Sequence, residues 1–181
     1  MADPQQPRVV KHVCGVLAAD AAVLDRAVEL LGETLGPVGS VSETWAFDFT
    51  RYYEKEMGSG LLRRFVAFRE PAGADLLAGR KRLTHLLERR IAEELPAGPP
   101  RPVNLDPGYV APDKLVLASM KDFSHRILLG RQVYAEVTLM YRDGAWRPLP
   151  WTFPDYASGQ YDAFLTACRE ELLARARERR S

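Results

Sequence analysis

The chain has 181 residues, a length typical of a single domain with one hydrophobic core. Its 25 Lys and Arg residues nearly balance 24 Asp and Glu residues, which leaves a net charge of +1. This balance excludes a global positive field that would attract nucleic acid or an acidic membrane surface, so a nucleic-acid partner is not expected. No apolar run approaches the length of about 18 residues that spans a bilayer, and no membrane association is predicted.

The start of the chain and its two cysteines indicate where the protein resides. Residues 1–7 are polar and lack the charged start and apolar region of a signal peptide, so we interpret them as a flexible arm ahead of one α+β domain over residues 8–181. Cys14 and Cys168 lie far apart and form no CxxC motif, which predicts neither a disulfide framework nor a zinc knuckle. A reduced, cytoplasmic location is the expectation.

The first predicted elements are a strand and a helix. β-branched residues over 9–19 indicate a buried strand. Asp20 is typical of a helix N-cap, and the apolar spacing that follows predicts a helix to about Leu35. Gly36 and Pro37 provide the stop.

Two strands and a second helix come next. Residues 38–49 and 61–69 read as strands around a polar, Gly-containing loop, which favours an antiparallel pair. A helix is predicted from about Gly73 to Leu95. Its expected apolar stripe consists of Leu76, Leu83, Leu87 and Ile91.

The segment VNLDPGYV (103–110) follows three prolines that forbid helix continuation, and its Asp-Pro-Gly sequence is typical of a turn. To this point the order of elements is βαββαβ. This order is that of a ferredoxin-like core, in which two helices cover one face of an antiparallel sheet. We therefore predict an α+β fold with a ferredoxin-like βαββαβ core.

The remaining chain is predicted to extend this core with a hairpin and a helix. Strands are expected over 115–120, 126–130 and 133–142, and Asp143-Gly144 is a strong hairpin signal. A closing helix is expected from near Ser158 to Arg177. Strict alternation over 133–142 would direct Val133, Ala135, Val137, Leu139 and Tyr141 to the core face and Tyr134, Glu136, Thr138 and Arg142 to a polar face.

Five segments together resemble a known family. They are FDFTRYYEKEMG (47–58), VNLDPGYV (103–110), KLVLASMKDFSHRILLG (114–130), YAEVTLMYRDG (134–144) and PWTFPDY (150–156). In these segments the chain resembles the domain-of-unknown-function family four-four-one-six, a family of uncharacterised bacterial proteins, over nearly its whole length. The resemblance implies no activity, cofactor or site residue.

The segment KDFSHR (121–126) carries four ionisable groups between two apolar runs, so we expect it on a turn between two core strands. Lys121 and Arg126 suit a phosphate or carboxylate, with Asp122 beside them. His125 can exchange a proton near neutral pH. The alternative is an ordinary charged hairpin turn.

Glu136, on the polar face of the following strand, could hold a cation or position His125 as a general base. It could equally be a surface carboxylate that pairs with Arg142. Asn104 and Asp106 could bind a ligand or a metal, although an Asx cap is the favoured role of Asp106. The sequence leaves open whether segments 104–109 and 121–126 meet in space.

The loop that contains Tyr52 and Tyr53 offers aromatic rings beside carboxylates, which could cover a planar ligand or contact a protein. The alternative is a helical turn that buries Tyr53 and Met57. The segment PWTFPDY (150–156) is expected to pack the last helix against the sheet.

Several chemistries are excluded by missing motifs. No GxxxxGK[ST] or GxGxxG is present to cradle a phosphate. None of the three His residues lies in an H-x-[ST] motif of the two-histidine phosphoesterases. His12 and Cys14 supply only two zinc ligands, and no GxSxG motif marks a nucleophilic serine.

We therefore favour a small-molecule site for a phosphate-bearing or nucleotide-like ligand, with enzymatic activity left open. The residues predicted to act in catalysis are His125, Asp106 and Glu136, and those predicted to bind the ligand are Asn104, Lys121, Asp122, Arg126 and Tyr53. The alternative is a protein-interaction module without catalysis. RNA binding is a weaker alternative, because Phe65 and Phe68 fall on opposite faces of their strand. The sequence indicates no cofactor, metal or oligomeric state.

Overall fold

The computed structural model describes residues 7–178, so the predicted N-terminal arm, apart from Pro7, and the last Arg residues lie outside the described part. The strands are β1 (Val9–Ala18), β2 (Val38–Val41), β3 (Trp45–Ala46), β4 (Leu62–Phe68), β5 (Ala72–Gly73), β6 (Val103–Val110), β7 (Lys114–Ser119), β8 (Ile127–Gly130), β9 (Val133–Arg142) and β10 (Ala145–Pro148). The helices are α1 (Ala21–Leu35), α2 (Glu54–Met57), α3 (Leu77–Glu94), α4 (Pro154–Ala157) and α5 (Asp162–Glu178), and a short 3-10 helix, Ala74–Leu76, precedes α3.

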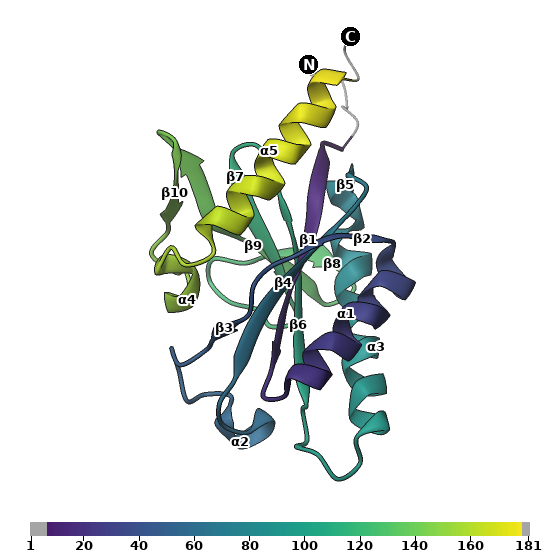
Figure 1. The fold of residues 1–181 in the computed structure, drawn as a ribbon. Helices are drawn as coiled ribbons and strands as arrows, with labels where there is room; N and C mark the ends of the chain where they lie inside the picture. The colour runs from purple at the N-terminus through teal and green to yellow at the C-terminus, as the bar shows by residue number, and fades with distance from the viewer. Residues whose placement is uncertain (1–6, 179–181) are drawn as a thin grey trace.

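The strands form one ten-stranded sheet in which the order β10-β9-β7-β6-β1-β4-β2 runs from edge to edge. Every pair along this path is antiparallel. Helices α1 and α3 pack on one face of the sheet, and α5 packs on the other (Figure 1). This architecture confirms the α+β class and the large antiparallel sheet. Among the described residues, no helix is long and apolar enough to cross a membrane.

Local sequence signals account for several elements. Asp20 caps α1, because its Oδ1 accepts a hydrogen bond from the backbone N of Ala22 at 2.7 Å. Asp143 and Gly144 both adopt positive φ angles, 51° and 76°, in the tight turn of the β9–β10 hairpin. The first strand, the first helix and this hairpin are therefore confirmed.

The turn predicted at Asp106-Pro107-Gly108 is wrong, because these residues continue β6, which pairs with β1 from Val103 to Val110. A proline is tolerated there because β6 pairs with β7 only from Gly108 onward. In an antiparallel ladder the backbone groups of successive residues point to alternate sides, so the nitrogen of Pro107 points away from β1. On that side no described strand pairs with Pro107, and no N–H donor is needed there.

The apolar stripe predicted for α3 is only half right. Leu87 and Ile91 are buried, but Leu76 and Leu83 are exposed. The buried face of α3 consists of Leu77, Lys81, Thr84, Leu87 and Ile91. Lys81 and Thr84, two polar residues that the predicted stripe did not include, thus form part of the buried face.

Strict alternation fails in β9 because its pairing with β7 skips Thr138. Leu115 is opposite Leu139, whereas Val116 is opposite Val137. After this bulge, the side chains of β9 point to the face opposite to the one that strict alternation predicts. Leu139 therefore lies on the same face of the sheet as Glu136. The freed carbonyl oxygens of Val137 and Thr138 accept hydrogen bonds from Trp151 and Thr152.

The strand predicted over 126–130 is present as β8, but it is not a core strand. Its side chains Ile127, Leu128 and Leu129 are all exposed. Segment 121–126 therefore connects the buried strand β7 to a strand on the surface.

Replacement of Gly108 by Ala is expected to lower the free energy of unfolding by about 1–3 kcal/mol. A Cβ at this position would overlap the backbone O of Val116 and a methyl of Leu117. Chemical denaturation measures the loss. Gly79→Ala in α3 is the matched control, because a Cβ there meets nothing within 4 Å, and it should be neutral or stabilising. Equal effects of the two substitutions would contradict the close approach of β6 and β7.

Candidate functional site

A split in the sheet creates the candidate site. The ladder between β6 and β7 ends at Gly108 and Leu117. Beyond this point β6 continues beside β1, while β7 continues beside β9. The backbone of β6 facing the split therefore has no neighbouring strand among those that the structure describes.

Side chains of α3 replace that missing strand. The Nζ of Lys81 donates to the backbone O of Leu105 at 2.7 Å, and the backbone N of Leu105 donates to Glu88 at 2.7 Å. Both polar groups of this buried residue are thereby satisfied, as burial requires. The helix that covers the sheet thus also holds the split open.

A cavity of about 810 Å³ lies at the split, which is within the size range of small-molecule sites. Its walls come from β4, β6, β7, β9, α3, α4 and the loops 47–53 and 120–126. Both charged groups and aromatic rings line it, and the lining includes Phe47, Tyr52, Tyr53, Arg63, Lys81, Glu88, Arg101, Asn104, Asp106, Lys121, Asp122, Phe123, Arg126, Glu136, Phe153, Asp155 and Tyr156.

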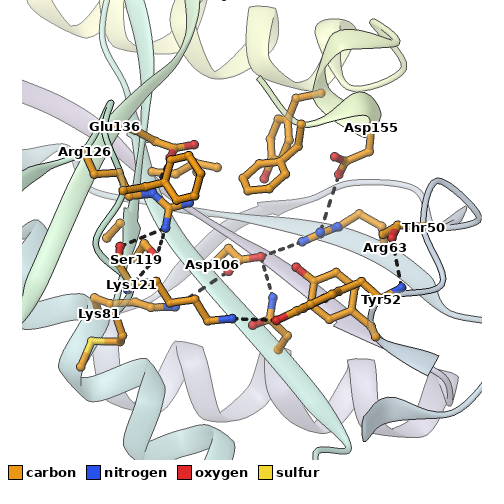
Figure 2. A pocket seen from close by; sticks show the side chains of 18 of the residues that line it. Thr50, Tyr52, Arg63, Lys81, Asp106, Ser119, Lys121, Arg126, Glu136 and Asp155 are labelled. Atoms are coloured by element: carbon orange, nitrogen blue, oxygen red, sulfur yellow. Dashed lines mark hydrogen bonds and ion pairs between the residues drawn. The ribbon is translucent and has the colours of Figure 1, made fainter. Parts of the chain in front are cut away.

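Asp106 lies at the centre of one cluster of charges. Its carboxylate accepts hydrogen bonds from Arg63 at 3.1 Å and from Asn104 at 2.7 Å, and Lys81 lies 3.8 Å away (Figure 2). The facing residue of β1 is Gly15, where a Cβ would lie 3.0 Å from the Arg63 guanidinium. A strand residue without a side chain thus leaves room for Arg63.

Arg63 links Asp106 to a second carboxylate. Its Nη2 lies 3.6 Å from Asp155, and Tyr161 donates to Asp155 at 3.1 Å. Arg63 is only 3% exposed, and although burial lowers its pKa, the nearby Tyr156, Asp106 and Asp155 keep that pKa above the ordinary value. The guanidinium is therefore a permanent buried cation.

The two carboxylates on Arg63 differ in acidity. Burial alone would raise the pKa of Asp106, but Lys81 and Arg63 outweigh it and hold this pKa below its ordinary value. Burial dominates at Asp155 and raises its pKa despite Arg63. The site thus contains one firmly ionised carboxylate and one that takes up a proton more readily.

Glu136 forms the second cluster of charges. Its Oε2 accepts hydrogen bonds from the Nε of Arg126 at 2.7 Å and lies 2.9 Å from the Nε2 of His125. Arg126 also donates to Ser119 and to the backbone O of Lys121, which fastens the connecting loop (Figure 2). The alternative pairing of Glu136 with Arg142 at the surface is wrong, because Glu136 is buried.

Seven of the eight predicted site residues line this one cavity: Asn104, Asp106, Lys121, Asp122, Arg126, Glu136 and Tyr53. Segments 104–109 and 121–126 therefore meet in space. The eighth residue, His125, is not among the lining residues; it contacts Glu136 and stacks on Trp151 with ring centroids 5.2 Å apart. The favoured Asx-cap role of Asp106 is wrong, since its hydrogen-bond donors are side chains.

Sequence reasoning missed Arg63, Lys81, Glu88 and Asp155. The spacing of Lys81, His85 and Glu88 places three polar side chains on one face of α3, and all three line the cavity. That spacing was a usable signal. Asp155 lies in a segment assigned to packing, and that segment in fact contributes both a buried carboxylate and cavity wall.

The mouth of the cavity carries less constrained cations. Lys121 is exposed; its Nζ donates to the Tyr52 hydroxyl at 3.0 Å and lies over that ring. Arg101 hydrogen-bonds Asn104 and lies 3.7 Å from Glu56. In the described part of the chain, no group of three or more His, Cys, Asp or Glu residues could hold a metal ion.

Comparison with known proteins adds one finding. A family model described as Domain of unknown function (DUF4416) matches residues 8–172. The chain belongs to this family. Every residue that lines the cavity lies within the DUF4416 match. No curated protein and no solved structure matches the chain.

Replacement of Arg63 by Met should destabilise the fold by about 3–5 kcal/mol at neutral pH, because the buried Asp155 and the partly buried Asp106 lose their shared cation. Chemical denaturation at several pH values measures this. The loss should shrink at acidic pH, where the carboxyls become neutral.

The matched control is Arg64→Met, on the opposite face of the same strand, whose ion-pair partner Asp25 is exposed. It should cost under about 1 kcal/mol. A loss for Arg63→Met as small as that of the control would contradict the electrostatic role of Arg63.

Proposed function

We propose that the cavity binds a small molecule that combines an anionic group with a planar, hydrogen-bonding part, as phosphate-bearing and nucleotide-like ligands do. One observation supports this most strongly. Seven buried side-chain polar atoms have no hydrogen-bond partner among the described residues, and three of them belong to side chains that line the cavity: Glu136 Oε1, Arg63 Nε and Tyr156 Oη. Buried polar atoms are nearly always hydrogen-bonded, and a ligand that draws these side chains toward the cavity would supply the missing partners.

These atoms specify the polar part of the ligand. Glu136 Oε1 accepts hydrogen bonds, Arg63 Nε donates, and the Tyr156 hydroxyl does either. Burial raises the pKa of Tyr156 well above its ordinary value, so this hydroxyl keeps its proton. A ligand with both N–H donors and carbonyl or ring-nitrogen acceptors fits this set better than a bare phosphate does.

The anionic group is expected at the mouth rather than in the depth. Arg63 and Arg126 are already paired with carboxylates, whereas the exposed Lys121 side chain has, within residues 7–178, only a neutral hydroxyl as its hydrogen-bond acceptor. The exposed rings of Phe123 and Phe153 also line the cavity and would flank a planar group. A phosphate on Lys121 with the planar part directed inward satisfies both features.

A catalytic role in proton transfer remains part of this proposal. Asp106 and Asp155 have pKa values displaced in opposite directions, which is the arrangement that separates a base from an acid. His125 would act on a ligand only through Glu136, because it does not line the cavity. Glu136, Asp106 and Asp155 are thus the candidates for direct contact.

The alternative functions receive less support. Tyr52 and Phe153 are exposed, as a protein-interaction module requires, but both line the cavity. RNA binding on the sheet would need exposed aromatic rings, and Phe65 and Phe68 are buried.

We further propose that β6-β1-β4-β2, with α1 and α3 on one face, form a ferredoxin-like core; the antiparallel strand order supports this. A cytoplasmic location also remains a proposal, and the free, buried Cys14 and Cys168 agree with a reduced compartment.

The test is a thermal-shift screen of the purified protein against inorganic phosphate, nucleosides, nucleoside phosphates and sugar phosphates. A nucleoside phosphate at about 100 times its Kd should stabilise the protein by about 2.7 kcal/mol, which raises Tm by several degrees. Nucleosides without phosphate and inorganic phosphate alone should give smaller shifts.

Variants locate the binding site. Lys121→Ala should weaken the shift given by the phosphorylated ligand but not that given by the nucleoside, and Glu136→Gln should weaken both. Arg147→Ala is the control, because Arg147 is exposed on β10 and does not line the cavity. The proposal fails if no compound shifts Tm, or if Lys121→Ala and Glu136→Gln both leave every shift unchanged.

A further inference from the structure

Strand β8 has an unprotected apolar edge. Ile127 is 72% exposed, Leu128 57% and Leu129 45%. In the described residues β8 pairs only with β9, so the backbone groups on its outer side have no strand partner. Natural sheets block such edges with charged residues or prolines, and residues 127–130 contain neither.

A groove of about 700 Å³ adjoins this strand. It lies between α3 and the turn that follows β8, and its apolar wall consists of Leu83, Leu86 and Met120. Ile127 is opposite Ala135, which packs in the same cluster as Leu77 at the start of α3. Ile127 and the groove are therefore on the same face of the sheet.

The charge of the groove selects its occupant. Arg82, His85 and Arg131 line it, and none of the acidic residues in the described part of the chain does. Among the described residues, the guanidinium groups of Arg82 and Arg131 have no hydrogen-bond or ion-pair partner. An exposed apolar surface beside unpaired cations is complementary to an apolar segment that also carries acidic side chains.

We propose that β8 and this groove bind an extended, acidic and apolar segment of a partner protein, which adds to the free edge of β8 as a further strand. Backbone hydrogen bonds then supply affinity, and the leucines and arginines select the sequence. This inference does not rest on the ligand proposed for the cavity, since none of the β8 residues lines that cavity, although His85 and Met120 line both the cavity and the groove.

A second copy of the chain fits the edge less well. Two β8 strands paired about an axis between Leu128 and Leu129 would place Arg126 opposite Arg131, which sets like charges against each other. A membrane surface would bury the apolar side chains but leave the edge backbone groups without partners.

The experiment selects binders from a displayed library of random peptides of about twelve residues. The expected peptides alternate apolar residues with Asp or Glu, as strand addition requires. A synthetic copy of the selected peptide should slow amide exchange along β8. Leu128→Asp should weaken its binding about tenfold or more, and Arg131→Glu should weaken it less.

Val41→Asp is the matched control, because Val41 is also exposed, 43%, but lies on β2 at the opposite end of the sheet. It should leave peptide binding unchanged. Equal melting temperatures for the variants establish that all of them fold.

Three outcomes overturn the inference. The first is that no peptide is enriched, that the enriched peptides lack acidic residues, or that their binding survives Leu128→Asp. The second is a dimer in light scattering that Leu128→Asp dissociates, which assigns the edge to a second copy. The third is co-sedimentation with phosphatidylglycerol vesicles that Leu128→Asp abolishes, which assigns the surface to a membrane.

Discussion

The separation of β6 from β7 is the constraint on which the site depends. Two neighbouring strands cannot diverge inside a protein unless other groups satisfy the exposed backbone, because an unpaired buried amide or carbonyl costs on the order of 1–3 kcal/mol. Lys81 and Glu88 meet this requirement at Leu105. Pro107 reduces it further, since it has no N–H to satisfy. The polar side chains of α3 and the proline in β6 thus act together, because both reduce the number of unpaired backbone groups that β6 would have at the split.

The cavity that results is electrostatically balanced rather than strongly positive. Five basic residues line it (Arg63, Lys81, Arg101, Lys121 and Arg126), as do five acidic ones (Glu88, Asp106, Asp122, Glu136 and Asp155). In a medium of low dielectric constant an unmatched charge is expensive, so the deep cations and carboxylates are held in fixed pairs. Selectivity in such a site comes from the few polar atoms left unpaired and from the looser charges at the mouth.

The sequence allowed part of this site to be predicted, for a physical reason. Lys121, Asp122, His125 and Arg126 lie within six residues, so their charge density is a local property that needs no knowledge of the fold. Arg63 lies 43 residues from Asp106, and only the pairing of β4 and β6 on either side of β1 brings them together. The bulge at Thr138 could not be predicted from the sequence either, because period-two alternation contains no information about register shifts.

The prediction of a turn at 106–108 failed because local propensity was weighed without its neighbours. Asp-Pro-Gly favours a turn only when the chain is free to reverse. Here β1 fixes the extended conformation along the whole segment, and Gly108 is required by the close approach of Val116 and Leu117 rather than by a turn. Asp106, Pro107 and Gly108 thus belong to the part of β6 that borders the split in the sheet.

The cavity and the β8 surface share structural parts. Met120 and His85 line both the cavity and the groove, and Arg126 anchors the intervening loop to Glu136, Ser119 and the backbone of Lys121. A ligand that displaces Met120 or rotates Arg126 therefore alters the wall against which a β8 partner would pack. Any such effect must be reciprocal, because two binding sites that share a coupling free energy change each other's affinity by the same factor.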